Sequence, residues 1–334
     1  MKKSLVFVWV HLGPKRIPKY LIKSIARTNR MFPHIEKFII VDHEKNKSAD
    51  LSGYANLFYT GSIEDDWSVV IREMEHDLKF REAFWFTTMA RFKALEIFMK
   101  KNEGNSVIHI ESDVILLNSF PVQTFIKLQT GLAFAFESHG QGIAAILYIG
   151  SHKDAVDLVD FCELEVKSNP RLTDMTALAS YRERFPAKVI VLPTIPMASG
   201  ADIHEDQRVF AENSRLFSGV FDGISIGQYL FGVDPRNHRG FRKVFWHDPG
   251  HLFDPEKWRF RWEQERLFIE NGLVESEVFN LHIHSKDLRA FDSKSLNKLV
   301  KKRLDQFGNP TKKEFDIRAF AKAIISSLIR RIND

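Results

Sequence analysis

The chain has 334 residues, of which 44% are hydrophobic and 27% are charged, so it can bury a sizeable core and is not disordered throughout. Its one cysteine, Cys162, excludes a disulfide framework or a multi-cysteine zinc site and indicates a reducing compartment. The net charge of +5 favours anionic small ligands or an anionic membrane surface. No nucleic-acid-binding motif is visible, so we expect no nucleic-acid partner.

Strand-like and helix-like segments alternate from the N-terminus to Val191. Helical spacing of apolar residues predicts helices over residues 18–31, 83–100 and 153–167. Apolar runs predict strands over residues 5–10, 37–41, 57–59, 107–117, 132–136, 144–149 and 189–191. This alternation predicts an α/β fold built on a mostly parallel sheet flanked by helices. Gly, Asp, Asn and Pro are frequent over residues 195–240, which predicts ordered loops there.

The two ends of the chain indicate where the protein works. The apolar stretch after Met1 is too short for a signal peptide, and no later run is long enough to span a membrane, so we expect a cytoplasmic protein. Residues 315–331 form a basic, amphipathic helical pattern. It predicts peripheral contact with the inner face of the membrane, or else a helix docked on its own domain or on a dimer partner. The oligomeric state stays open.

Two carboxylates, Glu111 and Asp113, interrupt the apolar run over residues 107–117. Carboxylates rarely occupy a buried strand unless they are paired or hold a metal. Residues two apart in a strand point to the same side, so both side chains can reach one ligand at the carboxyl end of a parallel strand. Such oxygen ligands suit Mg²⁺ or Mn²⁺ with a phosphate. The alternative is a pair bound by neighbouring arginines or helix N-termini.

A second cluster lies at residues 282–286, where His282 and His284 alternate with apolar residues and Lys286 follows. The same spacing argument places both imidazoles on one side of an extended segment. A histidine can complete a metal shell, and a lysine can bind a phosphate as a point charge. The alternative is a pair of structural histidines with satisfied hydrogen bonds.

The order of these features resembles that of GT-A glycosyltransferases over residues 5–290. The matching segments are the first strand at 5–10, the helix segment 87–92 with its arginine, the Glu111-Ser112-Asp113 sequence in place of the DxD motif, the strand at 145–150 and the histidine motif at 281–286. The resemblance implies a GT-A catalytic domain over residues 1–290 and a basic helical tail over 291–334. The first acid is a glutamate, one methylene longer than aspartate, which leaves its direct contact with the ribose open. The precise family also stays open, because the histidine motif lacks the full glycine-and-lysine pattern of the glycogenin-like families.

The resemblance also implies roles for individual residues. Asp113 would bind Mn²⁺ or Mg²⁺, with one of His282 and His284 as the remaining protein ligand. Glu111 would touch the metal shell or the ribose of a nucleoside diphosphate-sugar donor, most simply a UDP-sugar.

Further residues would complete the donor site. Arg91 and Lys286 would contact the diphosphate or the donor sugar. Val8, in the nucleotide-binding first strand, and Asp42, after the second, would hold the nucleotide. The acceptor would be a glycan or a lipid-linked glycan in surface polysaccharide synthesis.

An inverting transferase needs a carboxylate base at the acceptor hydroxyl. Asp222, in a glycine-rich segment, is our first candidate, and the alternative is an N-cap for a helix beginning near Ile224. Asp174 is the second candidate, and the alternative is again a helix cap. Whether the enzyme inverts or retains stays open.

Two other functions compete with this interpretation. A nucleotidyltransferase would use a similar sheet and metal, but it usually has a glycine-rich basic loop after the first strand. Here residues 11–16 contain one glycine, which disfavours it. The other alternative is a non-catalytic, membrane-associated module that binds glycans.

Overall fold

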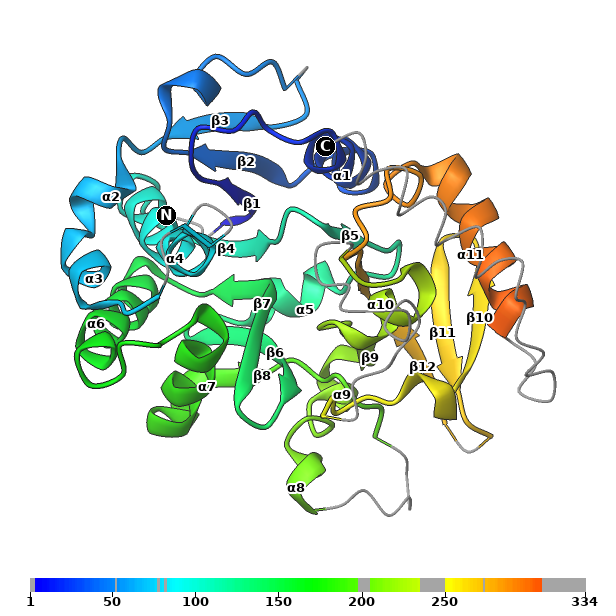
Figure 1. Cartoon of the computed structure of the whole chain (residues 1–334). Helices are drawn as coiled ribbons and strands as arrows, with labels where there is room; N and C mark the ends of the chain where they lie inside the picture. Colours follow the sequence, from blue (N-terminus) through cyan, green and yellow to red (C-terminus); the bar gives the residue numbers. More distant parts are fainter. Residues whose placement is uncertain are drawn as a thin grey trace.

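The computed structural model describes residues 4–51, 53–76, 79–80, 83–197, 205–234, 250–272 and 274–307. At its centre is a seven-stranded sheet (Figure 1), whose strands follow the order β3-β2-β1-β4-β7-β6-β8. Their bounds are β1 (Ser4–His11), β2 (Glu36–Val41), β3 (Asn56–Tyr59), β4 (Asn105–Ile110), β6 (Leu132–Ser138), β7 (Gln141–Ile149) and β8 (Val189–Val191).

The central sheet is mostly parallel. Strand β1 pairs in parallel with β2 and β4, β2 with β3, and β6 with β8. Strand β7 is antiparallel to both of its neighbours, β4 and β6. Every strand except β7 therefore runs in the same direction, and the predicted α/β fold with a mostly parallel sheet is confirmed.

Helices cover both faces of this sheet (Figure 1). Their bounds are α1 (Lys19–Met31), α2 (Ile63–Asp66), α3 (Ser68–Glu73), α4 (Phe84–Lys101), α5 (Val122–Lys127), α6 (His152–Ser168) and α7 (Asp174–Arg184). Three of the predicted helices correspond to α1, α4 and α6, within one or two residues at each end.

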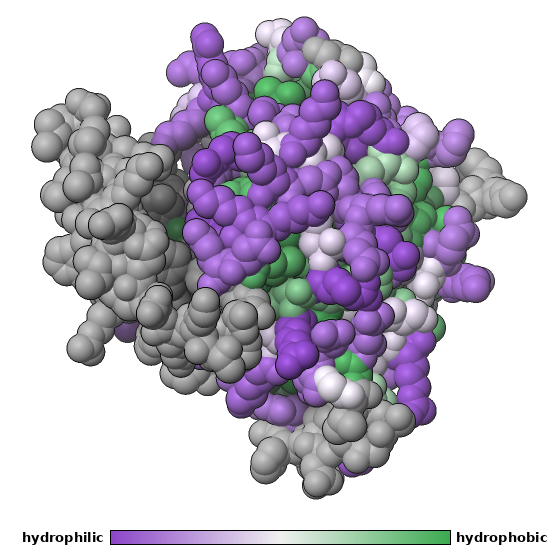
Figure 2. All heavy atoms as spheres, turned by 90° about the vertical axis from the view of Figure 1, so that its right-hand side faces the viewer, coloured by the Kyte–Doolittle hydropathy of each residue, from purple (hydrophilic) through white to green (hydrophobic). Residues whose placement is uncertain are grey.

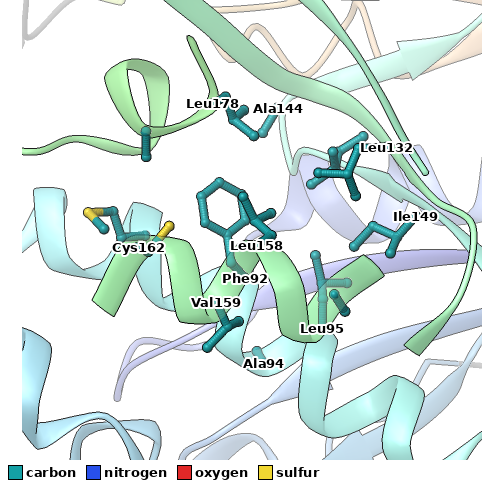
Figure 3. Close-up of a cluster of buried hydrophobic side chains, with 14 of the residues drawn as sticks. Phe92, Ala94, Leu95, Leu132, Ala144, Ile149, Leu158, Val159, Cys162 and Leu178 are labelled. Carbon is teal, nitrogen blue, oxygen red and sulfur yellow. The ribbon is translucent and has the colours of Figure 1, made fainter. Parts of the chain in front are cut away.

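Alternate residues of β1 enter two different hydrophobic clusters, as the period of two of a strand requires. Val6 and Val8 pack with α4 and α6, whereas Phe7 and Trp9 pack with α1 and α5. Figure 3 shows the first cluster, where Phe92 and Leu95 of α4 and Leu158 and Cys162 of α6 face strand residues such as Leu132.

The remaining strands form a second, smaller β layer outside the central sheet. It contains a four-stranded sheet in the order β10-β11-β12-β9 and a pair of strands, β5 and β13. The bounds are β5 (Val114–Leu116), β9 (Gly219–Val220), β10 (Arg259–Glu263), β11 (Arg266–Glu270), β12 (Glu275–Val278) and β13 (Asn280–His282). Helices α10 (Ser225–Phe231) and α11 (Ser293–Phe307) pack on this layer in a third hydrophobic cluster.

The region over 195–240 departs from the prediction of loops alone. Its described part contains α8 (Glu205–Arg208), α9 (Ser214–Phe217), β9 and α10. The helix expected near Ile224 as the alternative for Asp222 corresponds to α10. Elements α8, α9 and β9 are only two to four residues long, so glycines and polar residues dominate their local pattern. Three short 3-10 turns complete the described elements, at η1 (Glu44–Asn46), η2 (Pro186–Lys188) and η5 (Pro255–Lys257).

The C-terminal part begins with a packed helix. Leu296 and Val300 of α11 are buried in the third cluster, beside Leu281 and Trp262. The predicted amphipathic segment 315–331 lies outside the described residues, and the division at residue 290 stays a prediction. No helix within the described ranges has the length and hydropathy needed to span a membrane.

Candidate functional site

The acidic pair lies in a turn. Strand β4 ends at Ile110 and β5 begins at Val114, so the single strand predicted over residues 107–117 is wrong. The chain leaves the central sheet here because β5 pairs with β13, a partner far away in the sequence, in antiparallel register. Glu111 and Asp113 therefore sit at the carboxyl end of β4, the edge at which open α/β sheets bind ligands.

The pairing of β5 with β13 brings His282 to this turn. Its direct strand partner is Val114, and the N–H of Ile283 donates to the carbonyl oxygen of Asp113 at 2.7 Å. As a result, Nε2 of His282 lies 3.4 Å from Oε2 of Glu111 and 3.3 Å from Oδ1 of Asp113. The structure thus joins the two motifs that the sequence analysis singled out.

The three side chains fit a divalent cation. One ligand atom from each of Glu111, Asp113 and His282 lies within 4.8 Å of the other two. The Nδ1–H of His282 donates to the carbonyl oxygen of Gly223, at 2.5 Å. That bond leaves Nε2 to face the carboxylates, which is the ring orientation that an outer hydrogen bond gives a ligating histidine.

Arg91 of α4 holds one side of this group. Its Nη1 forms an ion pair with Glu111, its Nη2 lies 3.0 Å from Oδ2 of Asp174, and its Nε donates to the carbonyl of Thr88 at 2.6 Å. Arg91 is buried, and all three of its nitrogens bond within the protein. Its observed contacts orient Glu111, and the predicted contact with a diphosphate would require one of them to open.

Lys286 contacts the candidate metal ligands on the side opposite Arg91. Its Nζ lies 3.7 Å from Oδ2 of Asp113 and 3.7 Å from Oδ2 of Asp234. The backbone of Lys286 has a φ of 53°, in the left-handed region that side chains other than glycine seldom adopt. Strain of this kind concentrates at functional sites, where the surrounding contacts enforce it.

The charges of the group leave an excess of negative charge. Four carboxylates, those of Glu111, Asp113, Asp174 and Asp234, face the two cations Arg91 and Lys286. Counted over these described residues alone, with His282 neutral and all four acids ionised, two negative charges remain, which is the charge that a divalent cation would neutralise.

The two carboxylates also act on the imidazole of His282. Burial works to lower the pKa of His282, but Asp113 and Glu111 together raise it to about 9. Burial works to raise the pKa of Asp113, but His282 and Lys286 hold it well below its usual range. Arg91 outweighs burial in the same way and lowers the pKa of Glu111. The imidazolium therefore stands between two carboxylates.

His284 lies against the same group. Its ring centroid is 4.0 Å from that of His282, so both imidazoles do lie together, although β13 ends at His282. Burial and the neighbouring His282 lower the pKa of His284 to about 3, so its ring is neutral. Its buried Nε2 has no hydrogen-bond partner among the described residues. Of the two histidines, His282 places its nitrogen beside the carboxylates.

Asp222 is held by main-chain groups. Its carboxylate accepts hydrogen bonds from the N–H groups of Ile226 at 3.0 Å, Gly227 at 2.8 Å and His282 at 2.9 Å. It therefore caps the first turn of α10, as the alternative interpretation expected, although the N-cap residue itself is Ile224. Burial raises the pKa of Asp222 to about 6. Its catalytic role stays a prediction.

Asp174 opens α7, but the N-cap is Thr173, which forms a capping box with Thr176. The capping alternative therefore belongs to Thr173, because the Asp174 carboxylate pairs with Arg91 instead. Burial outweighs this arginine and raises the pKa of Asp174. The structure brings Asp174 to the site through Arg91, and its catalytic role stays a prediction.

The two residues predicted to hold the nucleotide differ in their surroundings. Asp42 follows β2, and its Oδ1 accepts the N–H of Gly13 at 2.8 Å, so it lies at the same carboxyl edge of the sheet as Glu111. Val8 is fully buried in the first hydrophobic cluster. Its side chain is covered, and its role in holding the nucleotide stays a prediction.

A further polar cluster escaped the sequence analysis. Oε1 of Glu137, near the end of β6, accepts from Oγ of Ser225 at 2.6 Å and lies 2.9 Å from Nδ1 of His251. Glu137, Thr194 and Asp222 line one small pocket. Glu137 could have been found by the pattern that pointed to Glu111, because each is an acidic residue at the end of an apolar strand. His251 and Ser225 carry no comparable signal.

Comparison with known proteins gives remote structural likenesses. No family model and no curated protein matches the chain. Among solved structures, the galactosyltransferase LgtC in complex with donor and acceptor sugar analogues is 16% identical, with a TM-score of 0.40, over 61% of this chain and 83% of that one. A glycosyltransferase involved in glycosylation of the PBCV-1 major capsid is 14% identical, with a TM-score of 0.34, over 56% and 81%. The CTP complex of CMP:2-keto-3-deoxy-manno-octonic acid synthetase is 9% identical, with a TM-score of 0.34, over 60% and 93%. Likeness at this level assigns no activity to this chain.

Proposed function

We propose that the protein is a metal-dependent glycosyltransferase. It would transfer a sugar from a nucleoside diphosphate-sugar, with UDP as the expected nucleotide, to a glycan or lipid-linked glycan acceptor. The observation that supports this most directly is the group of Glu111, Asp113 and His282 at the carboxyl end of β4, flanked by the cations of Arg91 and Lys286.

Glu111, Asp113 and His282 would hold Mn²⁺ or Mg²⁺. When bound, the ion would supply positive charge next to the diphosphate as it leaves. Lys286 adds a second positive charge, and its Nζ, 3.7 Å from Asp113, would donate to a phosphate oxygen as the leaving group gains charge. Arg91 keeps the Glu111 carboxylate ionised and fixed in place through their ion pair.

In the transfer, the bond between the anomeric carbon and the diphosphate oxygen breaks, and a bond to the acceptor oxygen forms. The acceptor hydroxyl loses its proton. Asp222, whose pKa burial raises to about 6, suits a base that works near neutral pH better than Asp174, which is tied to Arg91. Asp222 would have to loosen its main-chain hydrogen bonds to accept that proton.

Thermal unfolding with UDP, GDP or CDP, each with and without Mn²⁺, tests this function. A ligand that binds the folded state raises the melting temperature. At a hundredfold excess over its Kd, it adds about 2.7 kcal/mol to the free energy of unfolding. We expect a rise with one diphosphate that requires Mn²⁺. Asp113→Asn should abolish it, and Asp160→Asn, at an exposed position of α6, should not.

The product identifies the reaction. Release of a nucleoside diphosphate from the nucleotide-sugar supports the transferase, whereas release of pyrophosphate from a nucleoside triphosphate indicates a nucleotidyltransferase. No thermal shift with any of the three diphosphates would contradict the proposed function.

A further inference from the structure

Helices α1 and α11 carry an unusual concentration of positive charge. Together they contain nine lysines and arginines and one carboxylate, Asp305, whereas the whole chain has a net charge of only +5. Seven of these cations are exposed, and we call them the basic face: Lys19, Lys23, Arg30, Lys294, Lys298, Lys301 and Lys302.

The two helices that carry the basic face meet at the start of α11, where the exposed carboxylate of Asp292 also lies. Ser293, the first residue of α11, accepts hydrogen bonds from Arg27 at 2.8 Å and from Arg30 at 3.3 Å, both on α1. The rings of Tyr20 and Phe291 are 5.7 Å apart and join the same two segments. The start of α11 therefore lies against α1, and exposed cations flank this junction on both helices.

The charges form stripes at helical spacing. On α11, Lys294, Lys298 and Lys302 follow one another at intervals of four residues, opposite the buried Leu296 and Val300. On α1, Lys19 and Lys23 have the same spacing. Like charges at this interval disfavour a helix. Among the described residues, none of these five lysines forms a close ion pair, although the exposed carboxylate of Asp292, directly before α11, interacts electrostatically with Lys23.

An apolar side chain protrudes beside these charges. Leu288, between the segment of Lys286 and the start of α11, is 41% exposed and is followed by the exposed Arg289. Figure 2 shows that the face of the molecule on the right of Figure 1, where α11 lies, is mainly hydrophilic with small apolar spots. Cations around an isolated aliphatic side chain suit the interface of a bilayer with anionic lipids.

We propose that the basic face binds the surface of an anionic phospholipid membrane. The exposed side chains favour lipid over nucleic acid, because the described side chains of α1 and of α11 up to Gln306 include no exposed aromatic ring on which a base could stack. Nζ of Lys286 lies 5.8 Å from the centre of the Tyr20 ring, so α1 also borders the candidate metal site. Attachment here holds that site close to the membrane. The binding itself does not depend on the proposed reaction.

Vesicle sedimentation of the full chain tests the proposal without any substrate. We expect binding to vesicles that mix phosphatidylglycerol with phosphatidylcholine, no binding to phosphatidylcholine alone, and a loss of binding as salt rises. Each lysine near the membrane contributes roughly fivefold to the partition coefficient. The variant with Lys19→Glu, Lys23→Glu, Lys294→Glu and Lys298→Glu should therefore bind at least tenfold more weakly.

The control reverses two exposed lysines at the end of α4, Lys100→Glu and Lys101→Glu, on another side of the sheet (Figure 1). It should bind vesicles almost as the unmodified chain does. Leu288→Ser should weaken binding several-fold with no change in its salt dependence. Both charge variants should keep the melting temperature and the response to UDP with Mn²⁺, which separates this test from that of the proposed function.

Three outcomes overturn the proposal. If the four-lysine variant binds like the unmodified chain, another part of the protein carries the binding. If the unmodified chain does not distinguish anionic from neutral vesicles, the charges play no part. If the unmodified chain binds duplex DNA more tightly than anionic vesicles at equal salt, and the four-lysine variant loses that binding, the basic face is a nucleic-acid surface instead.

Discussion

Gly227 offers the sharpest test of how the candidate site is held together. It lies inside α10, where alanine would ordinarily stabilise the helix by about 1 kcal/mol relative to glycine. A Cβ at this position would lie 2.0 Å from the carbonyl oxygen of His282 and 2.9 Å from Oδ2 of Asp222. Ordinary contacts begin at 3.4 Å, so the backbone of β13 would have to move by more than an ångström.

The magnitude for Gly227→Ala follows from these contacts. Overfilling a packed site costs about 1–3 kcal/mol. The shift would also strain the hydrogen bonds that Asp222 accepts from Gly227 and His282, each of which contributes about 1 kcal/mol. After subtracting the gain in helix propensity, we expect a loss of about 2–4 kcal/mol in the free energy of unfolding.

Urea unfolding of Gly227→Ala measures this loss. Gly140→Ala is the matched control, because a Cβ at Gly140 would meet nothing within 4 Å. The control should change stability by less than about 1 kcal/mol. If Gly227→Ala is as stable as the unmodified protein, or more stable, the close contact between α10 and β13 is not as described and the reasoning is refuted.

Three further predictions concern buried polar groups. Burial works to raise the pKa of Glu96, but hydrogen bonds from Lys93 and His152 outweigh it and lower the pKa. The ionised Glu96 therefore stabilises the folded protein above the ordinary glutamate pKa, and this stabilisation is lost as the pH falls through the folded-state pKa. Glu96→Gln should therefore cost about 1 kcal/mol in urea unfolding near neutral pH and progressively less in acid; an equal cost at both would contradict this. Burial raises the pKa of the Cys162 thiol, so iodoacetamide should label it only after denaturation; rapid labelling of the native protein would show that the thiol is accessible. Arg91→Met leaves the buried carboxylate of Asp174 without its ion-pair partner, removes one of the two partners of Glu111, and should cost about 3–5 kcal/mol by calorimetry; a loss below 1 kcal/mol would mean that the ion pairs are not formed.

The local pattern of the sequence predicted the elements whose partners lie nearby in the fold. Apolar runs and helical spacing identified every strand of the central sheet, together with α1, α4 and α6. The break between Ile110 and Val114 was not predictable, because it depends on pairing with β13, far away in the sequence. Strand β10 carries a visible alternation of Arg259 and Arg261 with aromatic residues, but the charges masked it as a strand.

The same distinction applies to the candidate site. Glu111 and Asp113 stand out because carboxylates are rare in apolar runs, and His282 because of its spacing from His284. The ion pair of Arg91 with Asp174 is a tertiary contact between two helices, and no local pattern encodes it. Asp222 was found for its glycine-rich surroundings, yet the observed hydrogen bonds of its carboxylate hold the backbone of His282.

The central claim is that Glu111, Asp113 and His282 bind one divalent cation. Titration of Mn²⁺ into the full chain, followed by electron paramagnetic resonance of the free ion, tests it without nucleotide or acceptor. We expect one site per chain, a loss of at least about tenfold in affinity for Asp113→Asn and for His282→Gln, and no change for Asp160→Asn. Unchanged Mn²⁺ affinity in the first two variants would contradict the account.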